Sequence, residues 1–342
     1  MRGQNRSSPC YVLHAPWWID YAACNIWHEN NPVRNITSGC LALILLFVAV
    51  LGTPKKAPIA KPINVVTSST DFASIAKEIG KDRVEAFSPF KGYQEPELWV
   101  EEVFPSWMLK AAKADMYVRI GLLADVWADV VIEGSRNKKI FPGEAGYVDA
   151  SEGIEVLDVP TAKVDRASGE IHLQGNPHYL LDPLNGKIVA DNLLKGLIRI
   201  SPENADFFRA NAEDFKARID QAMGPWQVAA KPLEGAKLAA YHETWTYLAR
   251  RFGFRIVGYC EPKPGVPPTP LDLEKLIGVM KTEGVKAIIK APVYPDKIPN
   301  FIAGQTGAKV YTLPAHVEGV PEAKDYFALF DYLIAKLNEA VK

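Results

Sequence analysis

The sequence predicts an α/β fold of two Rossmann-like lobes with parallel sheets, joined by one long linker helix and separated by a cleft. Three observations predict this fold. Short β-branched segments alternate with amphipathic segments in both halves of the chain, which is typical of βαβ units. One much longer helical segment separates the two halves. The length of 342 residues suits two domains, and 48% hydrophobic residues can fill more than one core.

The first residues differ in pattern from the rest. Residues 1–33 show no sustained hydrophobic period, and we interpret them as a non-native N-terminal extension. Arg34 and the apolar run Leu41–Gly52 match the charged flank and h-region of a secretory signal. The run is shorter than the roughly 20 residues that span a bilayer as a helix. Residues 34–61 are therefore predicted to be a signal peptide and linker, and the mature protein to be periplasmic or otherwise extracytoplasmic. An uncleaved membrane anchor and a buried helix are the alternatives.

Cysteine content and charge narrow the class of protein. Cys10, Cys24 and Cys40 lie in the predicted leader, which leaves Cys260 alone in the mature protein. A single thiol cannot form an intramolecular disulfide, so the fold is expected to depend on packing. The formal net charge of −1 provides no basic field for nucleic acid.

The N-terminal lobe is predicted over residues 62–200. Its strands are β-branched runs, and its helices carry apolar residues at helical spacing. The predicted strands are Ile63–Thr67, Val84–Phe87 and Met116–Ile120, and the predicted helices are Asp71–Ile79 and Pro105–Ala114. A further helix is expected after Asp182 and Pro183, which suit the cap and first position of a helix.

The longest helical pattern covers residues 201–228. Ser201 suits the N-cap, Pro202 the first helical position and Glu203 the first turn. Apolar residues then recur at helical spacing for about five turns, as far as Gly224-Pro225. We predict that this helix links the two lobes.

The C-terminal lobe is predicted over residues 229–342, where the alternation of strands and helices resumes. The predicted strands are Leu238–Tyr241, Phe254–Val257, Ala287–Ile289 and Val310–Leu313. The predicted helices are Thr244–Arg251, Leu271–Glu283, Ile298–Thr306 and the C-terminal segment Ala323–Val341.

Four histidines lie beyond residue 61 and are the main candidates for chemistry. His242 directly follows a predicted strand, and ligands of open α/β sheets bind beyond the carboxyl ends of strands. A histidine there is either a ligand or a hydrogen-bonded structural residue. His178 lies on the loop GNPHYLLDP, where it is positioned for ligation. His172 is a ligand, a partner of a ligand or a loop residue. His178 and His242 come from opposite lobes and together favour a transition-metal site between them.

Motifs of common enzymes are absent from the sequence. There is no P-loop, no glycine-rich dinucleotide fingerprint and no G-x-S-x-G elbow. The segment YHETW departs from the H-E-x-x-H pattern of metalloproteases because residue 246 is threonine. A zinc hydrolase with Glu243 as general base is the enzymatic alternative. We predict a binding protein rather than an enzyme.

Several segments resemble the zinc/manganese-type solute-binding proteins of ABC transporters, the cluster A-I periplasmic metal-binding family. The most specific are GNPHYLLDP (175–183), YHETWTYLARRFGF (241–254) and EPKPGVPPTP (261–270). A fourth, GYQEPELWVEEVFPSWMLKAAKADMYVRIGL (92–122), is similar to the family's first ligand loop. The resemblance runs from Ile63 to the C-terminus. It implies two α/β lobes joined by one long helix, with a metal between them.

The resemblance also implies a set of ligands. Family ligands are usually histidines from three loops and a carboxylate from a fourth, and by motif His178 and His242 are the second and third. Glu97 stands where the usual Q-D-P-H pattern has the first histidine. The fourth position has no acid, and His316 is the nearest donor, with Glu318 as a weaker substitute. The predicted metal site is therefore Glu97, His178, His242 and His316.

By resemblance, the function is capture of a divalent transition metal and its delivery to an ABC permease in the membrane. The implied cargo is Zn²⁺ or Mn²⁺, and a carboxylate ligand is also compatible with Fe²⁺. A monomer is expected. The alternative is a binding protein of the same fold with an altered or lost metal site, acting as an adhesion or accessory protein. Protonation of histidine ligands predicts weaker metal binding at pH 5 than at pH 7.

Overall fold

The computed structural model describes residues 61–98, 103–161, 172–263 and 265–342, which belong to one compact unit, Ile59–Lys342. The predicted extension, the signal segment Leu41–Gly52 and three of the cysteines lie outside the described residues. Among the described residues, none of the helices combines the length and the hydropathy needed to cross a bilayer.

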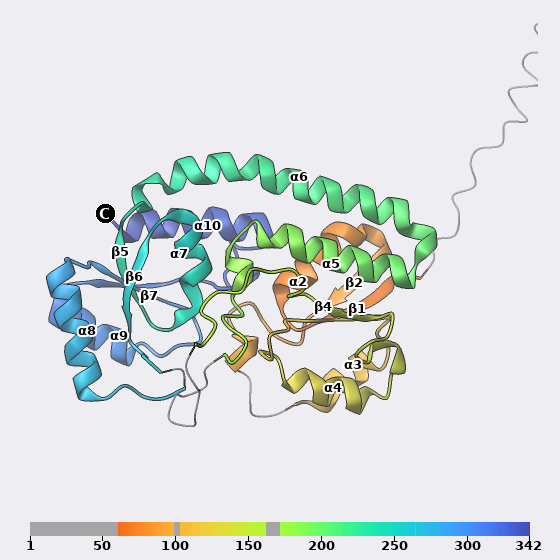
Figure 1. The fold of residues 1–342 in the computed structure, drawn as a ribbon, viewed down its shortest axis with the longest axis horizontal. Coiled ribbons are helices and arrows are strands. Elements are labelled where there is room, and N and C mark those ends of the chain that lie inside the picture. Colours follow the sequence, from red (N-terminus) through yellow and green to blue (C-terminus); the bar gives the residue numbers. More distant parts are fainter. Residues whose placement is uncertain (1–60, 99–102, 162–171, 264) are drawn as a thin grey trace, which may run out of the picture. The chain divides into compact units, whose positions relative to one another are not determined.

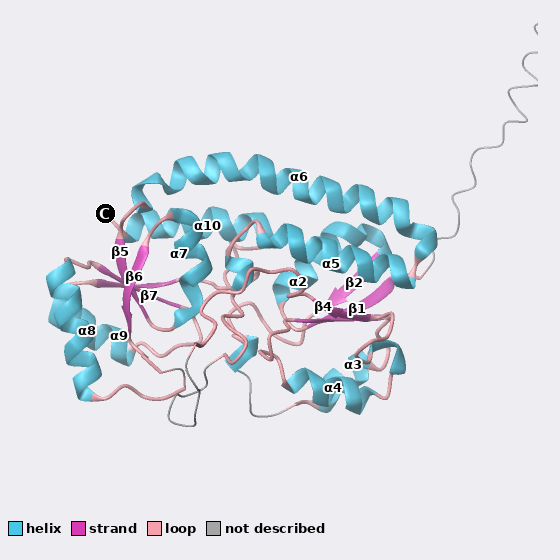
Figure 2. Ribbon diagram, in the orientation of Figure 1, coloured by secondary structure: helices cyan, strands magenta, loops and turns pink. Residues whose placement is uncertain are grey.

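The N-terminal lobe is built on a parallel sheet of four strands in the order β2-β1-β3-β4 (Figures 1 and 2). The strands are β1 (Ile63–Thr67), β2 (Val84–Phe87), β3 (Met116–Arg119) and β4 (Tyr147–Asp149). The flanking helices are α2 (Thr70–Gly80), α3 (Pro105–Ala111), α4 (Trp127–Ser135) and α5 (Asn185–Ile200). Short 3₁₀ helices are η1 (Lys81–Arg83), η2 (Pro96–Leu98), η3 (Lys138–Ile140), η5 (Tyr179–Leu181) and η6 (Pro202–Asn204).

The C-terminal lobe repeats this plan with the strand order β6-β5-β7-β8, again parallel. Its strands are β5 (Lys237–Ala240), β6 (Arg255–Tyr259), β7 (Ala287–Lys290) and β8 (Lys309–Thr312). Its helices are α7 (Thr246–Phe252), α8 (Pro270–Glu283), α9 (Lys297–Thr306) and α10 (Tyr326–Ala340), with the 3₁₀ helices η7 (Lys231–Leu233) and η8 (Glu243–Trp245). All of β7 is buried, as expected for a strand with helices on both faces of its sheet.

Helix α6 (Ala205–Ala230) connects the lobes and packs against α5 and α2 of the first lobe and α10 of the second (Figure 1). Its buried residues recur every three or four positions: Phe208, Ala212, Phe215, Ile219, Met223, Trp226 and Ala230. This single apolar stripe joins one continuous hydrophobic core that includes residues of both lobes.

The predicted fold class is confirmed: two α/β lobes with parallel sheets are joined by one long helix. The helix differs in its ends from the prediction. Pro202–Asn204 form a 3₁₀ turn, and the Ser201 hydroxyl bonds to Glu203 instead of capping. Pro225 does not end the helix, because the buried Trp226 anchors the last turn by donating to Asp331 at 2.7 Å. Strand β4 and helix α4 were not predicted from the sequence. The bounds of the lobes as domains stay predictions.

Candidate metal centre

The candidate metal centre is built from loops that follow the carboxyl ends of strands in both sheets. His242 follows β5 almost directly, and Glu95 and Glu97 lie on the loop after β2. His172 and His178 lie on the loop after β4. Because parallel strands bring their carboxyl ends to one edge, residues far apart in sequence meet there.

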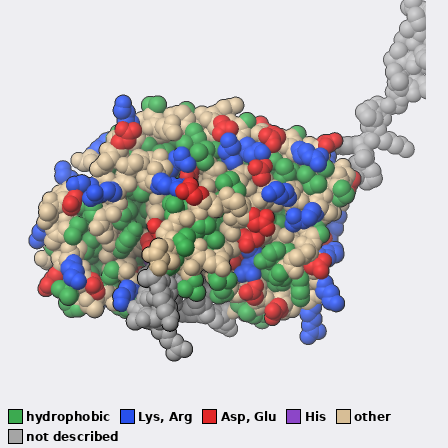
Figure 3. Space-filling model, viewed as in Figure 1, with side chains coloured by type: hydrophobic (Ala, Val, Ile, Leu, Met, Phe, Trp, Pro, Cys, Tyr) green, Lys and Arg blue, Asp and Glu red, His purple; other side chains and the backbone are tan. Residues whose placement is uncertain are grey.

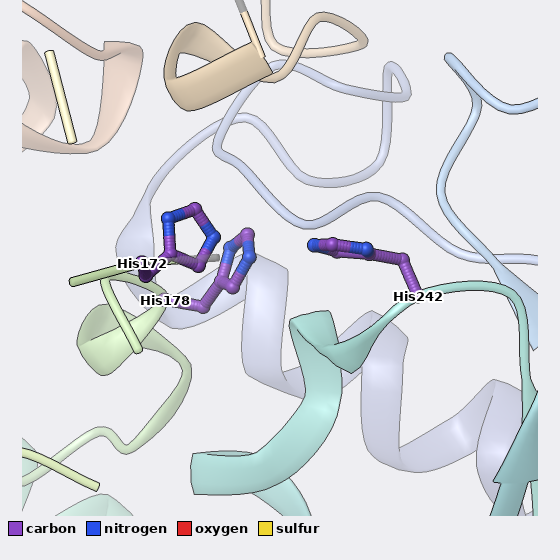
Figure 4. A group of neighbouring side chains, drawn as sticks. All are labelled: His172, His178 and His242. Atoms are coloured by element: carbon purple, nitrogen blue, oxygen red, sulfur yellow. The ribbon is translucent and has the colours of Figure 1, made fainter. Parts of the chain in front are cut away.

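Three imidazoles form the centre of the site. His172 and His178 lie side by side, and His242 points toward them from the other lobe (Figure 4). The ring centroids are 5.9 Å apart for His172 and His178, 6.2 Å for His172 and His242, and 5.9 Å for His178 and His242. One ring nitrogen of each lies within 4.8 Å of the others. Tetrahedral zinc would hold such nitrogens about 3.3 Å apart, since Zn–N bonds are about 2.0–2.1 Å. A small inward movement of the rings would therefore complete the coordination.

Two carboxylates complete the donor set around His178. Glu97 Oε1 lies 3.5 Å from His178 Nδ1, and Glu95 Oε2 lies 4.0 Å from the same nitrogen. The side chains of all three residues are 2% exposed. Glu95, Glu97 and His178 form a second group whose donor atoms lie within 4.8 Å of one another. Thus His178 belongs to both groups and lies at the centre of the donor set.

Four buried donor atoms of this site form no hydrogen bond with any described residue. They are Glu97 Oε1 and the Nε2 atoms of His172, His178 and His242. Buried polar atoms are almost always hydrogen-bonded, because an unpaired one costs about 1–3 kcal/mol. The residues that carry these atoms belong to two overlapping groups of possible ligands that share His178, an arrangement expected of a site that binds a cation.

The GNPH segment fixes the position of His178 locally. The Asn176 carboxamide accepts from the His178 backbone N–H at 3.0 Å and donates to the Glu243 carbonyl at 2.8 Å. Asn176 therefore joins the loops of His178 and His242. Gly175 has φ +100°, and a Cβ there would lie 2.4 Å from Val156 Cγ1, so only glycine fits.

Burial keeps the three clustered imidazoles neutral. It lowers the pKa of His172 to about 4, and burial with the adjacent charge of His172 lowers the pKa of His242 to about 4. Burial also lowers the pKa of His178 well below its usual range. Since only a neutral imidazole can bind a metal, these side chains are in the competent form at neutral pH.

The pKa values of the two glutamates are shifted in opposite directions. Burial and the charge of Glu95 raise the pKa of Glu97 well above its usual range. Burial by itself would raise the pKa of Glu95, but the charge and hydrogen bond of His316 lower it to about 2. The metal-free site therefore favours the protonated form of Glu97 and the ionised form of Glu95.

His316 is the predicted ligand that the structure places differently. It lines the same small cavity as Glu97 and His178. Its Nδ1 lies 2.5 Å from Asp71 Oδ2 and its Nε2 lies 3.1 Å from Glu95 Oε2, so both ring nitrogens are engaged. The structure thus brings His178 together with Glu97 and with His242, and it adds His172. Coordination by His316 stays a prediction.

Sequence reasoning missed Asp71 and Tyr294. Asp71 follows the first strand in the first turn of a helix, and that position was the available signal. Tyr294 lies near His242, with 5.7 Å between ring centroids, and its buried hydroxyl has no hydrogen-bond partner among the described residues. The buried Lys290 holds this loop by donating to the Tyr294 carbonyl at 2.7 Å.

The cavity beside the donor atoms is small. Its volume is about 20 Å³, and its lining includes Glu97, His178 and His316. That volume holds about one water-sized particle.

Comparison with known proteins identifies relatives over most of the chain. A family model described as ZnuA, zinc-uptake complex component A, periplasmic, matches residues 65–340. The chain is similar to the high-affinity zinc uptake system protein ZnuA of Bacillus subtilis, with 23% identity over 73% of this chain and 77% of that protein. It is also similar to the manganese ABC transporter substrate-binding lipoprotein PsaA of Streptococcus pneumoniae, with 23% identity over 88% of this chain and 98% of that protein.

Solved structures share the fold. A zinc-bound ZnuA deletion mutant aligns with a TM-score of 0.68 and 22% identity, covering 82% of this chain and 99% of that one. At this level of identity the likeness shows the fold and does not identify the metal ligands of this chain.

Proposed function

The chain belongs to the ZnuA family of periplasmic zinc-uptake components, and from this membership we propose that it captures a divalent transition metal for import. The proposed ligands are Glu97, His172, His178 and His242. The observation that carries the proposal is that four buried, unpartnered donor atoms belong to two overlapping groups of possible metal ligands that share His178. A lost metal site would leave those atoms unpaired in the protein interior at a large cost in stability. The comparisons likewise support metal transport and not the adhesion alternative.

Zinc is the proposed cargo. Three imidazoles and one carboxylate are a ligand set that suits tetrahedral zinc, whereas manganese prefers oxygen ligands. With Glu97 ionised, the ion and its four ligands carry a net charge of +1. The ionised Glu95 beside His178 would offset that charge. Manganese and iron(II) are expected to bind more weakly.

The proposed partner is an ABC permease, to which the protein delivers its metal as a monomer from the periplasmic side. A transport component needs affinity and release but no reaction, so we propose no enzymatic activity. Positive and negative side chains are interspersed over the face shown in Figure 3. That face therefore presents no single-sign field of the kind that binds nucleic acid.

Zinc is expected to stabilise the purified, metal-free protein against heat. A ligand at about 1,000 times its dissociation constant adds roughly 4 kcal/mol, which corresponds to a rise in Tm on the order of 10 °C. Thermal unfolding should be recorded with zinc, manganese and iron(II) at equal concentrations. Zinc should give the largest shift. If none of the three ions changes the Tm, the protein is not a carrier for these metals.

Zinc affinity is expected to fall between pH 7 and pH 5 because Glu97 must release a proton. The raised pKa of Glu97 predicts a loss of about tenfold per pH unit once the pH is below that pKa. His172 and His242, with pKa values of about 4, are already neutral over this range and add little. Glu97, rather than the histidines, is therefore the expected source of the pH dependence.

The Glu97→Gln variant tests this assignment. It should bind zinc more weakly at pH 7 but with a shallower dependence on pH, measured by competition with a chelator of known affinity. An unchanged slope in the variant would mean that another group releases the proton.

A further inference from the structure

His316 connects carboxylates from two separate elements of the N-terminal lobe to a loop of the C-terminal lobe. Its Nδ1 meets Asp71 of α2, and its Nε2 meets Glu95 of the loop after β2. His316 itself lies on the loop after β8. Both ring nitrogens can donate to carboxylates only when the imidazole is protonated. The charges of Asp71 and Glu95 outweigh burial and raise the pKa of His316 well above its usual range, which supports that state.

Neighbouring contacts hold the same two surfaces together. Val317 donates its backbone N–H to Asp71 Oδ1 at 2.8 Å, and the Thr70 hydroxyl donates to the Val317 carbonyl at 2.6 Å. Gly92 packs so closely on this loop that a Cβ there would lie 2.1 Å from the Val317 carbonyl oxygen. The His316 loop is thus docked on the N-terminal lobe by side chains and backbone together.

The same network reaches the proposed metal site through Glu95. One carboxylate oxygen, Glu95 Oε2, lies 3.1 Å from His316 Nε2 and 4.0 Å from His178 Nδ1. A carboxylate beside a metal-binding imidazole fixes the orientation of the ring and increases its basicity. Glu95 thus places a carboxylate charge beside His178 Nδ1, and the Glu95 carboxylate is itself held by His316.

We propose that His316 is a positioning residue that ties the two lobes together and holds Glu95 where it orients the His178 imidazole for the metal. The expected effect on zinc affinity rests on the proposed function. The tie between the lobes, formed by the contacts of His316, is a property of the metal-free protein. Zinc affinity tests the positioning role, and thermal stability without metal tests the tie between the lobes.

The test uses the full chain with His316→Gln, Glu95→Gln and the double variant. Thr70→Val is the matched control, because it removes a bond to the same loop without touching Glu95. Zinc affinity is measured by chelator competition. His316→Gln should weaken zinc binding about tenfold or more, the effect typical of losing support for a ligand. The double variant should bind no more weakly than Glu95→Gln alone, and Thr70→Val should bind like the wild type.

Thermal unfolding in excess chelator tests the tie without metal. The two single substitutions should each lower the Tm by a few degrees, and the double variant should lower it by less than their sum. If the Tm loss of the double variant equals the sum of the two single losses, His316 and Glu95 do not interact and the tie is overturned. The positioning role would be overturned by a second result: Tm losses that are not additive, together with a His316→Gln variant that binds zinc as tightly as Thr70→Val. If the wild type binds no zinc, the proposed function and the positioning role fail together, while the Tm data still decide whether the tie exists.

Discussion

The His178→Ala, His242→Ala double variant is expected to lose zinc-induced stabilisation entirely. It removes one imidazole from each lobe and leaves only Glu97 and His172 of the proposed ligands. Loss of a group that merely supports a ligand costs about 10–100-fold in affinity, so loss of two ligands should cost more than about 1,000-fold. The rise in Tm of roughly 10 °C expected for the wild type should therefore be absent at the same zinc concentration.

The same double variant in chelator provides the control. Both imidazoles are buried and leave Nε2 unpaired in the metal-free protein, so the packing lost with them is offset by the removal of two unpaired polar atoms, and the variant should stay folded. A variant that is folded in chelator and does not respond to zinc would place the cargo at this cluster. A wild-type response to zinc in the variant would show that the metal binds elsewhere.

Tyr326→Ala is expected to destabilise the metal-free protein by about 3–5 kcal/mol, the range for deleting a buried aromatic ring. The ring is fully buried at the start of α10, where a Cβ on Gly186 would lie 2.5 Å from it. Its hydroxyl donates to the Leu180 carbonyl at 2.9 Å, close in sequence to His178. The substitution should open a cavity beneath the loop that carries His178 and so loosen the metal site as well.

Tyr326→Phe is the matched control, since it keeps the ring and removes only the hydroxyl. Urea unfolding in chelator should show a loss of about 1 kcal/mol for this variant. If alanine and phenylalanine cost the same, the hydrogen bond to Leu180 rather than the packing of the ring stabilises this region.

Local patterns in the sequence predicted most of the secondary structure. β1 coincides with the predicted Ile63–Thr67, and α8 and α9 each begin one residue before the predicted helix and share its last residue. These segments have β-branched runs or strong helical periodicity, so local preference and tertiary structure agree. β4 was missed because three residues give too short a pattern. The C-terminal end of α6 was misplaced because Trp226 packing outweighs the local effect of Pro225.

The sequence by itself determined the class of the protein and singled out two of the three histidines that the structure clusters. Alternating strands and helices specify parallel sheets, and a parallel sheet directs ligands to the carboxyl ends of its strands, where His242 and the loop of His178 lie. A family motif added Glu97 as a carboxylate in place of a histidine.

Only the tertiary structure decided how His172 and His316 are arranged. Both are loop histidines with no periodic context, and their partners are distant: His316 meets Asp71 and Glu95 across 245 and 221 residues. Whether a histidine binds a metal or bridges carboxylates depends on which groups surround each ring nitrogen. Those surroundings arise only when two lobes, each folded from local patterns, bring their loops together.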